Sequence, residues 1–129
     1  MRRSFRELEA FCLQYSGAYA DYPWGPDTIV FKVEGHIFAM PSSAGAAALS
    51  VACKVSPTFR EAYRAHPATY TPPYVGRFGW LGIEVTDDET WDMATAAIEE
   101  SYALVRFRGR RRRPGSETPP ISGPPDRVS

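Results

Sequence analysis

The chain has 129 residues, of which 43% are apolar and 13% aromatic, and its formal net charge is zero. This length and composition predict one globular domain with a core of its own. No apolar run approaches the roughly 20 residues of a membrane-spanning helix. Acidic residues also follow the early arginines where a signal peptide would have an apolar stretch. We therefore expect a cytoplasmic protein.

The zero net charge hides a division of the chain into two parts. Residues 1–107 hold 9 basic and 13 acidic side chains, whereas residues 108–129 hold six arginines and two acidic residues. The second part is also rich in proline and glycine and has too few apolar residues to build a core. The sequence predicts a globular domain over 1–107 and a disordered, basic C-terminal tail over 108–129.

The first half of the chain reads as a helix followed by a hairpin. Apolar residues recur at helical spacing over residues 4–15, and Ser4 is a suitable N-cap. Residues 28–33 and 36–40 are rich in β-branched and aromatic residues, and Gly35 between them suits a turn with a positive φ. We expect an antiparallel hairpin there.

The second half alternates strands and helices. Residues 49–55 alternate as a third strand, and Ser56-Pro57 has the form of a helix start. A loop over 67–79 leads to a strand over 80–85, and a last helix begins at the acidic cluster 87–89. The fold class is therefore α+β, a mainly antiparallel sheet flanked by helices.

Several segments, taken in order, resemble the MmcQ/YjbR-like family over roughly residues 5–106. The resemblance is carried by Phe11-Cys12-Leu13, Asp21-Tyr22-Pro23-Trp24-Gly25, Phe31 to Ala39, Val51 to Pro57, Trp80 and Ser101 to Val105. It implies a CyaY-like (frataxin-like) or double-wing fold and a DNA-binding role. The chain departs from the family pattern before Trp80, where the usual His and Asn-Lys are missing and Arg77 supplies the positive charge.

Two groups of cations are candidates for contact with DNA phosphates. The first lies on the globular part, where Lys32 and Lys54 fall on the non-core faces of their strands, together with Arg77 and, as further candidates, Arg60 and Arg64. We expect weak binding to the phosphate backbone without sequence preference, by a protein that is a monomer.

The second group lies in the predicted tail and consists of Arg108, Arg110, Arg111, Arg112 and Arg113. Clustered arginines bind DNA by counterion release, and Arg108-Gly109-Arg110 with the later Pro114 partly resembles a minor-groove hook. A solubilising charged tail explains the same residues equally well.

An aromatic cleft is the alternative site. Its candidate residues are Tyr22, Trp24, Tyr74, Phe78 and Trp80. With one arginine nearby, such a cleft suits a small anionic or aromatic ligand, or a protein partner. Trp80 is also well explained as a buried residue at the start of a strand.

The sequence offers little for catalysis or metal binding. His36 and His66 have no cysteine or acidic residue at metal-ligand spacing, and the first helix lacks an acidic ridge for iron. There is no nucleophile elbow and no glycine loop for phosphate. We expect a protein that is not an enzyme, has no metal or cofactor, and keeps Cys12 and Cys53 as reduced core thiols.

Overall fold

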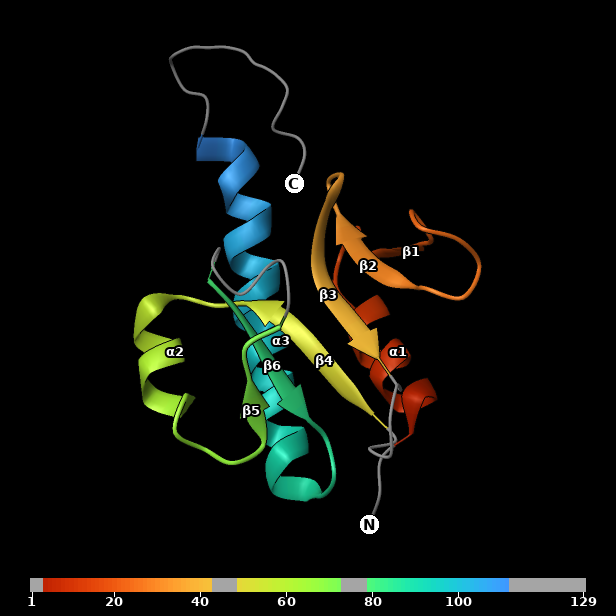
Figure 1. The fold of residues 1–129 in the computed structure, drawn as a ribbon. Coiled ribbons are helices and arrows are strands. Elements are labelled where there is room, and N and C mark those ends of the chain that lie inside the picture. Colours follow the sequence, from red (N-terminus) through yellow and green to blue (C-terminus); the bar gives the residue numbers. More distant parts are fainter. Residues whose placement is uncertain (1–3, 43–48, 73–78, 112–129) are drawn as a thin grey trace.

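The computed structural model describes residues 4–42, 49–72 and 79–111, with side chains described up to Arg106. In this part of the chain, six strands form one sheet in the order β1-β2-β3-β4-β6-β5, and each pairing is antiparallel (Figure 1). The elements are α1 (Phe5–Leu13), β1 (Tyr19–Asp21), β2 (Val30–Val33), β3 (His36–Ser42), β4 (Ser50–Lys54), α2 (Pro57–Tyr63), β5 (Thr69–Tyr70), β6 (Trp80–Glu84) and α3 (Asp88–Arg111). The predicted α+β class with an antiparallel sheet is confirmed.

The helices are placed unevenly around the sheet. Helix α3 packs against β3, β4 and β6, and α1 lies beside it on the same face (Figure 1). Helix α2 lies at the far side of the molecule from β1 and β2 (Figure 1). The core therefore lies between one face of the sheet and the pair α1 and α3.

Each helix starts at the predicted residue type. Ser4 caps α1 in a capping box, since its Oγ accepts from Glu7 N and its own N–H donates to the Glu7 carboxylate. Ser56 caps α2 with Pro57 at the first position. At α3, Thr90 donates its N–H and hydroxyl to the Asp87 carboxylate, and these two bonds lower the pKa of Asp87.

The β2–β3 hairpin turns at Glu34 and Gly35, whose φ values are 53° and 83°. Positive φ at both central residues defines the tight turn that suits the twist of paired strands. The predicted positive φ at Gly35 is confirmed.

The sequence did not predict two short strands, β1 and β5. Strand β1 lies next to the expected aromatic loop, and β5 lies within the segment 67–79 that the sequence predicts as a loop. Both are too short to show an alternating pattern. Strand β5 fits tightly, because the Tyr70 ring lies over Gly82 and leaves no space for a side chain there.

Helix α3 is longer than the sequence predicts. It continues to Arg111, so the first four residues of the predicted tail are helical. Arg108-Gly109-Arg110 accordingly lies in a helix and not in an extended hook. Residues 112–129 lie outside the described part of the chain.

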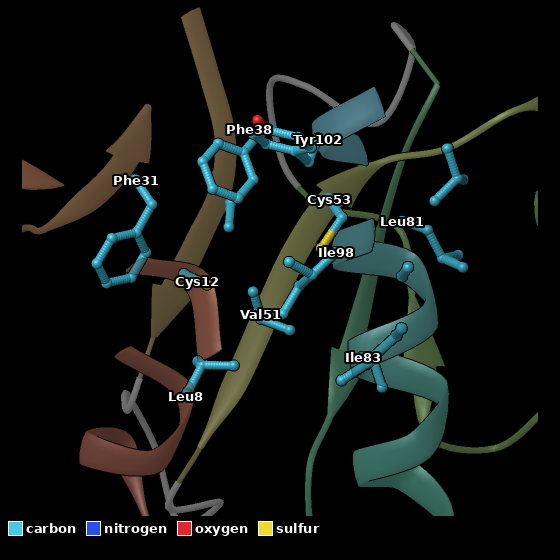
Figure 2. Close-up of a cluster of buried hydrophobic side chains, with 14 of the residues drawn as sticks. Leu8, Cys12, Phe31, Phe38, Val51, Cys53, Leu81, Ile83, Ile98 and Tyr102 are labelled. Carbon is cyan, nitrogen blue, oxygen red and sulfur yellow. The ribbon is translucent and has the colours of Figure 1, made fainter. Parts of the chain in front are cut away.

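The core is built on large side chains from every layer (Figure 2). Phe38 is fully buried, and its ring meets that of Tyr102 edge to face at 5.5 Å between centroids. Tyr102 also stacks on Tyr15 at 4.6 Å and donates its hydroxyl to Ser16 O at 2.7 Å. These contacts fix the C-terminal half of α3 against α1 and the sheet.

Candidate nucleic-acid interface

A cleft of about 490 Å³ opens where β4, α2 and the second half of α3 meet. Its lining includes three cationic residues, Lys54, Arg60 and Arg64, with Leu104 of α3 as the large apolar member. The remaining lining residues are Val55, Ser56, Pro57, Glu61 and Gly79. The cleft is large enough for a phosphate group and the sugar attached to it.

The cations of the cleft come from two elements. Lys54 ends β4, whereas Arg60 and Arg64 are four residues apart, so α2 carries them on one face. Glu61 is the one carboxylate in the lining, and it lies 3.7 Å from Arg64 in an exposed pair. Exposed pairs of this kind contribute little energy, so they are easily exchanged for an anionic ligand.

The cleft is held in shape by α3. The Glu100 carboxylate accepts the Ser56 N–H at 2.6 Å, which fixes the start of α2 against α3. The buried Ser101 hydroxyl accepts the Lys54 N–H at 3.0 Å and donates to Phe38 O at 2.7 Å. Ser101 therefore joins the end of β4, and with it the cleft wall, to β3.

A β-bulge explains why Ser101 is needed there. Phe31 pairs with Ala39, but the next residue, Lys32, pairs with Ile37, so Phe38 is an extra residue in β3. The β3–β4 ladder ends at the pair Ala39–Cys53, immediately before Phe38 and Lys54, and is interrupted there. The Ser101 hydroxyl fills this interruption, which would otherwise leave buried backbone groups unsatisfied.

Lys32 and Lys54 both lie on the sheet face opposite the core, in strands separated by β3. Lys32 Nζ contacts the Asp21 carboxylate at 2.7 Å. The hydrogen bond from Lys32, followed by that from Tyr22 N, lowers the pKa of Asp21. Lys32 is thus committed to a partner within the fold and is not part of the cleft.

The described members of the predicted aromatic cleft do not meet. Trp80 in β6 is buried, with 9% of its surface exposed, whereas Tyr22 and Trp24 in the β1–β2 loop are 49% and 64% exposed. Strands β3 and β4 separate β2 from β6. Tyr74 and Phe78 lie outside the described residues. Among the described residues, the rings therefore divide between a buried position at the start of β6 and an exposed loop.

Some of the other predicted phosphate ligands lie in described elements, and others lie outside the described residues. Arg108, Arg110 and Arg111 lie in the last turns of α3. Arg77, Arg112 and Arg113 lie outside the described residues. Sequence reasoning had named Arg60 and Arg64 only as further candidates, and it missed Leu104. The spacing of Arg60 and Arg64, one helical turn apart, was the sequence signal that could have placed them together.

The described residues contain no group of three or more histidines, cysteines or acidic residues placed to hold a metal ion. His66 Nδ1 accepts the Ala68 N–H, and its Nε2 lies 3.3 Å from the Glu89 carboxylate. Cys12 and Cys53 are free and buried, as predicted. Burial raises the pKa of Cys12 to about 12 and that of Cys53 well above its ordinary value, so neither thiol is activated as a nucleophile.

The fold and the cleft define a small α+β domain whose antiparallel sheet carries two helices on one face and a cationic cleft at one end. The family model YjbR matches residues 13–104, and the chain belongs to the YjbR family. The chain is also similar to the Deinococcus radiodurans protein DR2400, whose crystal structure contains a DUF419 domain. The TM-score is 0.68 at 23% identity, over 83% of this chain and 81% of that chain, and this likeness shows a shared fold. The comparison with curated proteins found no match.

No helix in the described ranges has the length and apolar character needed to cross a membrane.

Proposed function

We propose that the protein binds the phosphate backbone of DNA through the cleft formed by Lys54, Arg60, Arg64 and Leu104. The observation that carries the proposal is the gathering of three cationic residues around one open volume of about 490 Å³. The proposed activity is binding without catalysis.

The chemistry of the cleft favours phosphate over base edges. Lysine and arginine head groups on a shallow wall donate to phosphate oxygens, and such contacts carry no sequence information by themselves. The globular part as a whole is acidic, with 13 acidic against 9 basic side chains over residues 1–107. This net charge repels DNA away from the cleft and limits affinity. We therefore expect weak binding that depends strongly on salt.

The test is fluorescence anisotropy of a labelled DNA duplex, with the full chain, over a series of salt concentrations. The key variant is Arg60→Gln, and the matched control is Arg6→Gln, which removes the same charge from the exposed first turn of α1. Arg77→Gln is measured beside them, because Arg77 is a predicted ligand two residues before Gly79 in the sequence.

Each phosphate contact contributes about 0.9 to the slope of log affinity against log salt, or about eightfold between 1 M and 0.1 M salt. Arg60→Gln should lower the slope by about 0.9, and Arg6→Gln should leave it unchanged. Equal losses of affinity from Arg60→Gln and Arg6→Gln would show that binding depends only on total charge, and would overturn the proposed site. Absence of salt-dependent binding by the unmodified chain would overturn the function.

A further inference from the structure

We propose that the last two turns of α3 form part of this binding site, with Arg108 and Arg111 extending the cationic cleft along the helix. This inference rests on the proposed function and makes it more specific. It places positions 108 and 111 on the helix α3, whereas the sequence alone assigned them to a tail.

The side of α3 that borders the cleft is identified by three described contacts. Leu104 lines the cleft, Glu100 accepts the N–H of Ser56 in the cleft wall, and Ser101 accepts the N–H of Lys54. These residues span one turn and lie on one side of the helix. They orient the whole C-terminal half of α3.

The opposite side of α3 is identified by Arg106. Its guanidinium contacts the Glu34 carboxylate at 3.9 Å and donates to the Tyr102 hydroxyl at 3.2 Å. Position 106 is about 200° around the helix from Leu104. Arg106 therefore lies toward the β2–β3 turn and away from the cleft.

Helix α3 continues without interruption to Arg111. At about 100° per residue, positions 108 and 111 fall about 40° and 20° from the direction of Leu104. The helical backbone thus places both positions on the cleft side of α3, as a continuation of Leu104. Position 110, at about 240°, falls on the side of Arg106.

The length of this stretch suits a nucleic-acid backbone. From Leu104 to Arg111 the helix rises about 10 Å. The final turns of α3 extend past the ends of β4 and β6 (Figure 1). A backbone seated at Lys54, Arg60 and Arg64 can therefore continue along α3 to further phosphates, so the inferred partner is a strand of several nucleotides and not a single phosphate group.

The experiment compares two double variants of the full chain. Arg108→Gln/Arg111→Gln removes two charges from the cleft side of α3, and Arg106→Gln/Arg110→Gln removes two charges from the other side of the same turns. Both are titrated with the labelled duplex over the salt series and checked by circular dichroism and thermal melting, because Arg106 also contacts Tyr102 and Glu34.

The cleft-side pair should lower the salt slope by about 1.8 and the affinity at 0.1 M salt by about 60-fold, and the opposite pair should change both much less. Equal losses would overturn the inference, because a nonspecific basic segment responds only to its total charge. That result would leave the proposed function intact as long as Arg60→Gln still weakens binding more than Arg6→Gln.

A third variant separates helix geometry from charge. Gly109→Pro keeps all the arginines but interrupts the helix between positions 108 and 111. It should lower the affinity by about eightfold, as if one phosphate contact were lost. Unchanged affinity would show that the arginines bind independently of the helix and would also overturn the inference.

Discussion

The two ends of the sheet contain similar residue types in different settings. At the β1–β2 end, Lys32 contacts Asp21 at 2.7 Å and Trp24 is 64% exposed. At the β4–α2 end, Lys54 lines an open cleft with two arginines, and Trp80 in the neighbouring strand is buried. The difference shows that the neighbouring residues decide whether a cation pairs within the fold or lines a cleft, and whether an aromatic ring is buried or exposed.

Substitution of the two tryptophans should give the largest difference in the free energy of unfolding. Trp80→Ala should lower the free energy of unfolding by about 3–5 kcal/mol, because it removes a large side chain from a packed site. Trp24→Ala should change it by less than about 0.5 kcal/mol, since most of that ring is already in water. Urea unfolding followed by circular dichroism measures both. A comparable loss from Trp24→Ala would mean that the exposed loop is also part of the stabilising core.

Ser101→Ala should cause the next largest loss of stability. The substitution leaves the Lys54 N–H and the Phe38 carbonyl without their shared partner, and we expect a loss of about 2–4 kcal/mol in the same urea experiment. Thr95→Ala is the control, because the Thr95 hydroxyl donates to Asp92 O at an exposed position within the same helix. Ser101→Ala should also weaken DNA binding, since the end of β4 is no longer tied to α3. A variant as stable as the Thr95 control would contradict the role given to the bulge.

The two lysines should differ in DNA binding and not in folding. Lys54→Gln should lower the affinity for a duplex at 0.1 M salt by about eightfold, the value of one phosphate contact. Lys32→Gln should have a much smaller effect, because Lys32 lies outside the cleft. Anisotropy titrations of the two variants make the comparison directly. The reverse order would place the binding surface at the β1–β2 end.

The last variant concerns Asp21, whose removal should make the two ends more alike. Asp21→Asn releases Lys32 and should strengthen DNA binding by up to about eightfold, if the released ammonium gains one phosphate contact. No change would show that a lysine at this end does not reach DNA even when released.

The same pair gives a pH dependence with a definite sign. The pKa of Asp21 is lowered in the folded protein, so its contribution to stability is present above the ordinary carboxyl range. That contribution is lost as pH falls through the lowered pKa. The stability difference between the unmodified chain and Asp21→Asn should therefore be present at pH 7 and disappear in strong acid. A stability difference that persists in strong acid would show that an interaction other than the ionised Asp21 causes it.

Much of this fold was predictable because its signals are local. The caps at Ser4 and Ser56, the turn at Gly35 and the acidic start of α3 all depend on residues close in sequence. The pairing of Lys32 with Asp21 was not predictable in this way, because it requires β1, which is too short to show a pattern. The same holds for Ser101, because the role of its hydroxyl depends on a bulge in β3 and on the end of β4.

The candidate site shows the same limit. Lys54, Arg60 and Arg64 could each be named from the sequence as exposed cations. Their meeting around one cleft depends on where α3 places Leu104, which lies forty residues further along the chain than Arg64. Helix periodicity also locates positions 108 and 111, but only once Leu104 and Arg106 show which side of α3 borders the cleft.

The two buried thiols make the protein convenient for labelling. Cys12 and Cys53 are enclosed in the core and their raised pKa values keep them protonated near neutral pH. A cysteine introduced at an exposed position such as Trp24 or Glu61 should therefore react selectively with a maleimide dye, without removal of the native cysteines. Dyes at these two positions would report separately on the two ends of the sheet as DNA is added.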